Sequence, residues 1–110
     1  MASTTGRRQF QDVFSNVLTY QGTLDLGSAG DNDGTGAAFA SADVTVPGAA
    51  LGDLVLVSLG VDTVDLTLTA AVTAANTVTV TVNNGTINAV DLASTTVRIA
   101  VLQPGPLFYA

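Results

Sequence analysis

Short runs in which apolar and polar residues alternate recur along the chain and restrict its fold more than any other feature of the sequence. Over 64–72, valine, leucine and alanine side chains alternate with Asp65, Thr67 and Thr69. Over 77–82, three valines alternate with three threonines. Because successive side chains of a β-strand point to opposite faces of a sheet, this period of two predicts strands with one buried face.

Turn-forming residues separate these runs, and together the two signals predict about seven short strands. Valine and threonine, which are enriched in strands, contribute 15 and 16 of the 110 residues. No long helical segment lies between the runs, which excludes parallel βαβ folds. We therefore predict an all-β fold, an antiparallel β-sandwich with jelly-roll or immunoglobulin-like topology. The predicted strands are 18–26, 41–46, 53–59, 64–72, 77–82, 86–90 and 95–102.

Three local features make more specific predictions. The run 53–59 is apolar almost throughout, which is typical of a central strand covered on both faces. Asn84-Gly85 lies between two alternating runs and is a strong hairpin signal, so the strand before it should pair with 86–90. Gly22 interrupts the first strand and predicts a weak point or a β-bulge there.

The N-terminal residues differ from the predicted sandwich domain, 17–102. Residues 1–16 begin with nine small or polar residues, which predicts a flexible arm. A short amphipathic segment is the alternative, because five apolar residues in this region follow a helical spacing. They are Phe10, Val13, Phe14, Val17 and Leu18. At the other end, residues 103–110 leave the sheet through two prolines and form a short apolar tail.

The composition excludes several classes of function. The chain has no cysteine and no histidine, which removes disulfides, thiolate nucleophiles, histidine-based zinc sites and histidine general bases. We expect no enzymatic activity and no cofactor. Nine aspartates against three arginines give a net charge of −6, which argues against a nucleic-acid partner. No apolar run approaches the ~18–20 residues of a membrane span.

Two kinds of ligand, calcium and glycans, can be weighed from the sequence. Asp31 and Asp33 stand at the first and third positions of a segment that resembles the start of a calcium loop. The twelfth position, which should be glutamate, is Ala42, so we interpret the segment as a solvated turn with no metal. Glycan-binding sandwiches offer aromatic platforms to sugars. This chain has no aromatic residue between Phe39 and Phe108, which argues against glycan binding by the strands in between.

Four segments carry a resemblance to a known family. They are Leu24–Ser28, Val44–Asp53, Val72–Val80 and Val90–Val101. Over about residues 24–101, the sequence resembles a β-rich family of structural proteins of tailed bacteriophages. The shared motifs combine turn residues with strand periodicity and mark no reactive group.

The resemblance implies a virion protein without catalytic residues. A small acidic domain of this kind is similar to the decoration, or cement, proteins that lie as trimers on the outside of a capsid. The resemblance therefore implies a homotrimer that binds the major capsid protein on the outer surface. Binding would stabilise the shell by mass action. Because the same module occurs in tail and fibre proteins, host-surface glycan adhesion is the alternative.

Most aromatic residues lie near the two ends of the chain, and these ends supply the candidate contact residues. The candidate capsid contacts are Arg7, Arg8, Phe10 and Phe14. The candidates for docking between subunits or in a capsid groove are Leu107, Phe108 and Tyr109.

Overall fold

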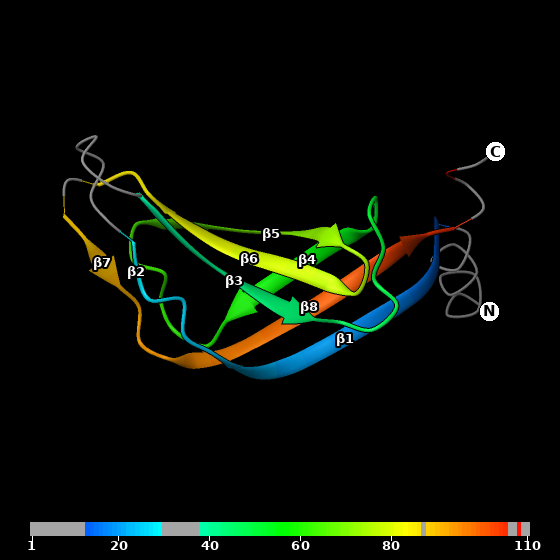
Figure 1. Cartoon of the computed structure of the whole chain (residues 1–110), viewed down its shortest axis with the longest axis horizontal. Coiled ribbons are helices and arrows are strands. Elements are labelled where there is room, and N and C mark those ends of the chain that lie inside the picture. The colour runs from blue at the N-terminus through cyan, green and yellow to red at the C-terminus, as the bar shows by residue number, and fades with distance from the viewer. Residues whose placement is uncertain (1–12, 30–37, 87, 106–107, 109–110) are drawn as a thin grey trace, which may run out of the picture.

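Long antiparallel strands make up most of the chain in this computed structural model, which describes residues 13–29, 38–86, 88–105 and 108. Two three-stranded sheets face one another (Figure 1). The first has the order β1 (Phe14–Leu24), β8 (Thr95–Pro104), β4 (Leu54–Leu59), and the second β3 (Phe39–Thr45), β6 (Thr77–Asn84), β5 (Leu66–Ala74). A short pair lies at one end of the molecule: β2 (Ser28–Ala29) and β7 (Val90–Asp91). The predicted all-β antiparallel sandwich is confirmed.

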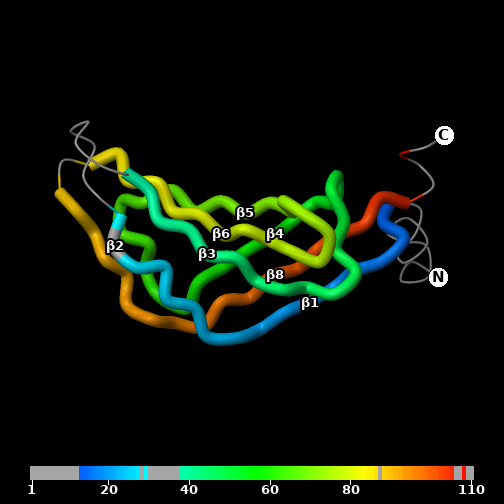
Figure 2. Tube along the Cα trace, in the orientation of Figure 1, coloured from blue at the N-terminus to red at the C-terminus, as the bar shows by residue number. Residues whose placement is uncertain are grey.

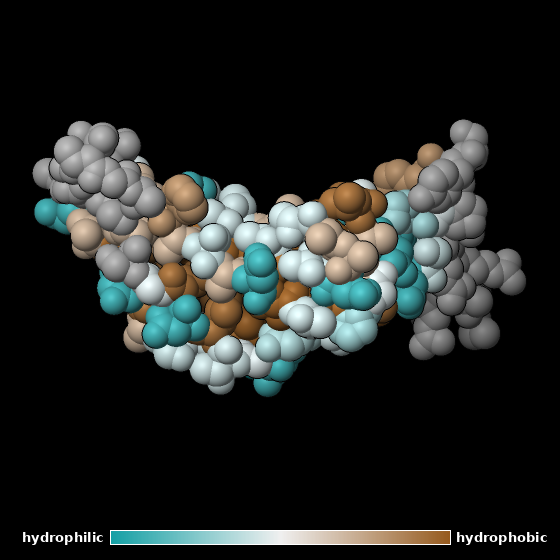
Figure 3. Space-filling model, in the orientation of Figure 1, coloured by the Kyte–Doolittle hydropathy of each residue, from teal (hydrophilic) through white to brown (hydrophobic). Residues whose placement is uncertain are grey.

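The core lies between the two sheets and is built from alternate positions of their strands. β-branched side chains pack well on a pleated surface, and the two central strands contribute six that are at most 2% exposed. They are Val78, Val80 and Val82 of β6, and Val97, Ile99 and Val101 of β8. Between β3 and β1, apolar atoms reach the surface (Figure 3). At the opposite edge, β4 and β5 approach each other.

The first and last strands, β1 and β8, run side by side for most of their length (Figure 2). Their register extends from Phe14 paired with Pro104 to Leu24 paired with Thr95. The strands therefore continue past both ends of the predicted domain, 17–102. Phe14, which also fits the helical spacing, lies on a strand, because β8 offers it a ladder of backbone partners.

The β-bulge in this ladder is displaced from its predicted position. The register shifts between Phe14 and Asn16, whereas Gly22 pairs regularly with Val97. The prediction of a weak point or bulge at Gly22 is therefore wrong. A Cβ atom at Gly22 would overlap the phenol of Tyr20. The glycine therefore leaves space for the Tyr20 side chain, which lies on the same face of the strand.

Two residues, Ala75 and Asn76, form the tight turn of the hairpin between β5 and β6. Asn76 has φ of 62°, in the left-handed region that asparagine tolerates better than most residues. Its backbone N–H donates to Ala49 O, and its Oδ1 accepts the Gly48 N–H at 2.8 Å. The turn is thereby joined to the loop before β4.

The hairpin predicted at Asn84-Gly85 is not formed, so that prediction is wrong. β6 pairs with β3 and β5, and of the described residues in the predicted partner, 86–90, only Val90 lies in a strand, β7. Gly85 does not have the positive φ that a type I′ turn requires. The side chain of Asn84 is buried instead and organises the loop that follows.

β4 lies at the edge of its sheet, so the prediction that it is central and covered on both faces is also wrong. The centre is occupied by β8, which pairs with β4 on one side and β1 on the other. Val55, Val57 and Leu59 pack against the core. Leu54 and Leu56 point away from it and are 47% and 62% exposed.

Candidate interaction surface

An exposed group of apolar side chains lies on the outer face of the β1–β8–β4 sheet. The strand register places them in two adjacent rows, the first Val17, Leu102 and Leu54, and the second Thr19, Ala100 and Leu56. Val17, Leu54 and Leu56 are exposed, whereas Leu102 and Ala100 are half-buried. We call Val17, Leu54, Leu56, Ala100 and Leu102 the apolar patch. Contiguous exposed apolar groups are typical of interaction surfaces, whereas isolated ones are not.

The outer face of the other sheet is polar. Threonines line β5 and β6 on this face, and Asp43 of β3 accepts a hydrogen bond from Thr79 Oγ1 at 2.7 Å. Thr79 also shares a 2.8 Å hydrogen bond with Thr73. Hydroxyl groups that bond one another and water suit a solvated surface. The difference between the two faces makes the outer face of the β1–β8–β4 sheet the candidate interaction surface.

A shallow depression of about 450 Å³ extends from the apolar patch toward a polar row. Among its lining residues are Leu56 and Ala100 of the patch, together with Gln21, Ser58 and Arg98. Arg98 Nε donates to Gln21 Oε1 at 3.0 Å, which holds the exposed guanidinium along the sheet. Arg98 is the only arginine or lysine among the described residues. The surface therefore has an apolar centre with a polar, cationic margin.

None of the three strands beneath this surface contains an aspartate. The aspartates of the described residues lie mainly in turns, where three of them accept backbone N–H groups. These bonds join Asp25 to Gly27, Asp53 to Ala50, and Asp62 to Val64. The three strands of this face thus contribute no carboxylate to it, and of the strands in the opposite sheet only β3 carries one, Asp43.

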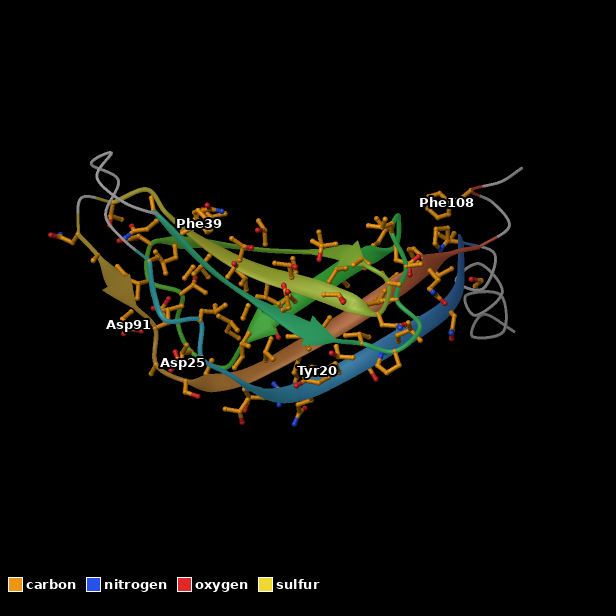
Figure 4. All side chains as sticks on the ribbon, viewed as in Figure 1. Tyr20, Asp25, Phe39, Asp91 and Phe108 are labelled. Carbon is orange, nitrogen blue, oxygen red and sulfur yellow. The ribbon has the colours of Figure 1, made fainter. Side chains whose placement is uncertain are left out.

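The structure describes two of the seven predicted contact residues. Phe14 begins β1, and Phe108 lies against it at the same end of the molecule (Figure 4). Their ring centroids are 6.2 Å apart, with planes tilted by 39°. One of the candidate capsid contacts, Phe14, therefore contacts one of the candidate docking residues, Phe108. Outside the described residues lie Arg7, Arg8, Phe10, Leu107 and Tyr109, and also the calcium candidates Asp31 and Asp33.

Sequence reasoning missed the apolar patch, although one signal for it was present. The apolar run 53–59 has the pattern of a doubly covered strand, but its outward residues Leu54 and Leu56 are the most exposed members of the patch. Among the described residues, no group of three acidic, histidine or cysteine side chains is arranged to hold a metal. Within that part of the chain, no helix is long and apolar enough to cross a membrane.

Comparisons with protein-family models, with curated proteins and with solved structures find no match to this chain.

Proposed function

We propose that this chain is a non-enzymatic structural protein of a bacteriophage virion, a capsid decoration (cement) protein. It forms a homotrimer on the outer surface of the capsid and stabilises contacts between subunits of the major capsid protein. The apolar patch is the observation that supports this proposal most directly. The patch combines exposed Val17, Leu54 and Leu56 with half-buried Ala100 and Leu102, and contact with another protein would remove this apolar surface from water.

The proposed mechanism is stabilisation by mass action. A trimer over a local three-fold position covers the seams between capsomers and binds only the assembled shell. Binding to one state alone shifts the equilibrium toward that state. The net charge of −6 suits the outer surface, because packaged DNA would repel this chain within a Debye length of about 8–10 Å.

The test adds purified protein to capsids of the phage that encodes it, prepared without the protein. We expect saturable binding with copy numbers in multiples of three, and a higher temperature of capsid disruption. Mass photometry of the capsids and a thermal melt measure the two quantities. Absence of binding by the wild-type protein would refute the proposal.

A second experiment asks whether the N-terminal residues anchor the protein. Deleting 1–12 removes the candidate contacts Arg7, Arg8 and Phe10 and leaves β1 intact, because β1 begins at Phe14. We expect lower capsid occupancy and an unchanged unfolding temperature of the free protein. Unchanged occupancy would show that the capsid contact lies elsewhere.

One observation favours the alternative function, adhesion of a tail or fibre module to a host glycan. Phe39 is 51% exposed on the otherwise polar face, in a row with Asn83 and Thr67. An aromatic ring beside amide and hydroxyl groups is a combination that sugars bind. Soluble glycans that raise the melting temperature of the wild-type protein, but not of Phe39→Ala, would support adhesion.

A further inference from the structure

We infer that the depression at Arg98 is a carboxylate-binding site, into which a protein partner places an aspartate or glutamate side chain. The apolar patch beside it packs against aliphatic side chains of the same partner. This inference rests on the proposed function, which makes the major capsid protein the partner. It names the face that binds the capsid and the chemical group that this face recognises.

Arg98 occupies the centre of the outer face of the β1–β8–β4 sheet, one row beyond the apolar patch. Strand register places it between Gln21 of β1 and Ser58 of β4. The adjacent row of the patch has Ala100 at its centre and Leu56 beside it. Rows on one face of a sheet are about 7 Å apart, because each residue of a strand rises about 3.4 Å. The cation and an exposed leucine are therefore neighbours on this face.

The guanidinium of Arg98 retains most of its hydrogen-bonding capacity. A guanidinium has five N–H donors, and the Nε–H donates to Gln21 Oε1 at 3.0 Å. Among the described residues, no carboxylate pairs with Arg98. The four N–H groups on the two terminal nitrogens are therefore available to a partner. A carboxylate matches them, because its two oxygens accept two parallel N–H bonds at once.

The depression itself has an apolar half and a polar half. Leu56 and Ala100 line the first, and Gln21, Ser58 and Arg98 line the second. Its volume of about 450 Å³ lies within the roughly 300–1,000 Å³ of sites that hold drug-sized ligands, so it accommodates a side chain together with its neighbours. An acidic side chain spans the two halves, with its methylene groups beside Leu56 and its carboxylate on Arg98.

The cost of covering Arg98 determines which partners this face accepts. A partner that buries Leu56 also withdraws water from Arg98, because the two side chains lie in adjacent rows. A cation that loses its water without gaining a carboxylate is strongly unfavourable. The partner must therefore supply the acceptor that the chain does not provide on this face. The apolar patch contributes affinity, and Arg98 selects partners that bring a carboxylate.

A second copy of this chain does not meet this requirement through the same face. β1, β8 and β4 contain no aspartate, so two such faces packed together would leave both copies of Arg98 without a carboxylate. A different protein supplies the acceptor. The other charged side chains of the described residues are all aspartates, which repel a carboxylate. An acidic side chain of the partner is thus attracted at Arg98, which fixes the docking position.

Two variants of equal net charge test the role of Arg98. Arg98→Gln and Thr67→Glu each make the net charge of −6 more negative by one unit, and Thr67 is exposed on the opposite sheet. Both are titrated onto capsids prepared without the protein. We expect Arg98→Gln to weaken binding by more than about tenfold, and Thr67→Glu by no more than about twofold. Equal effects of the two substitutions would overturn the inference.

Carbodiimide cross-linking identifies the group that Arg98 contacts, because the chain has no lysine. Arg98→Lys places an amine at the site, and Thr67→Lys places one on the opposite face. The reagent joins an amine and a neighbouring carboxylate into an amide, and it takes up the water that is lost to become a urea. We expect a bond from residue 98, but not from residue 67, to an aspartate or glutamate of the capsid protein. Mass spectrometry of the digested product locates it.

A second matched pair tests the apolar half of the site. Leu56 is 62% exposed, and Leu51, in the turn before β4, is 71% exposed. We expect Leu56→Ala to weaken capsid binding by more than about fivefold, and Leu51→Ala to change it by no more than about twofold. Equal losses would show that the depression is not the contact. All substituted residues in these pairs are exposed, and unfolding temperatures close to that of the wild type would verify that the variants fold.

The inference and the proposed function fail in different ways. Wild-type protein that binds capsids, with Arg98→Gln binding equally well or with no cross-link through residue 98, would overturn the inference and leave the decoration protein in place. Cross-links from residue 98 to other copies of this chain would assign the carboxylate to a second copy and would overturn it as well. Failure of the wild-type protein to bind capsids would refute the proposed function, and the inference with it.

Discussion

The phenol of Tyr20 lies over Gly22, two residues further along β1 on the same face of the sheet. Tyr20 packs against the main core cluster, and the atoms nearest to a Cβ built at Gly22 are all in its ring and hydroxyl. Glycine weakens a strand because it has no side chain to pack. Here its neighbour occupies that space, so the two residues act as a unit.

Gly22→Ala should therefore destabilise the protein by displacing the Tyr20 ring. We expect a loss of about 1–3 kcal/mol in the free energy of unfolding, as for other overpacked sites. In a Tyr20→Leu background the shorter side chain leaves the space empty, and the same substitution should cost less than about 0.5 kcal/mol. Urea denaturation followed by circular dichroism measures both. An equal loss in both backgrounds would contradict the coupling.

Asn84→Ala should be more destabilising than a typical substitution in a strand. The buried side chain donates from Nδ2 to the carbonyls of Ala29 and Asn88 and accepts the N–H and hydroxyl of Thr86. Removing it takes a hydrogen bond from each of these groups at a buried position, and we expect a loss of about 3 kcal/mol. The control is Asn83→Ala, at the exposed neighbouring position, which should change stability by about 0.5 kcal/mol or less. Chemical denaturation of both variants provides the comparison.

Substitutions at Asn76 should separate backbone strain from the side-chain hydrogen bond. Asn76→Gly keeps a residue that accepts φ of 62° and loses only the bond to Gly48, at about 1 kcal/mol. Asn76→Ala loses the same bond and adds strain, for a total of about 2 kcal/mol. Melting temperatures should fall in the order wild type, glycine, alanine. A glycine variant less stable than the alanine variant would argue against strain at this turn.

The contact between Phe14 and Phe108 should stabilise the end of the sheet where β1 begins and β8 ends. Neighbouring aromatic rings at this separation contribute about 0.5–1.5 kcal/mol beyond the area that they bury. A double-mutant cycle with Phe14→Leu and Phe108→Leu should give a coupling energy in that range. Additive effects of the two substitutions would show that the ring contact contributes nothing.

Sequence periodicity predicted the sandwich because it reports which residues share a face. It did not predict strand order, because that depends on contacts between distant segments. An apolar run such as Leu54–Leu59 has the same pattern in a doubly covered central strand and in an edge strand that binds a partner. The apolar patch was missed for this reason.

The false hairpin at Asn84-Gly85 has a different cause. The dipeptide favours a tight turn locally, but burial of the Asn84 side chain against Ala29 outweighs that preference. Ala29 is 55 residues away from Asn84 in sequence, so the local sequence pattern around Asn84 does not predict this contact. At Asn76 the local preference and the distant contacts agree, because asparagine tolerates φ of 62° and the bonds to Gly48 and Ala49 hold the same turn.

The pairing of β1 with β8 has a consequence for the order of folding. Gln21 and Arg98 bond across 77 residues, so the loop closed by this pairing spans most of the chain, and such closures slow folding. β3, β5 and β6 are all synthesised before β8. The sheet that carries the apolar patch is therefore completed last, and a newly made chain does not carry the complete apolar patch until β8 has been synthesised and has paired with β1 and β4.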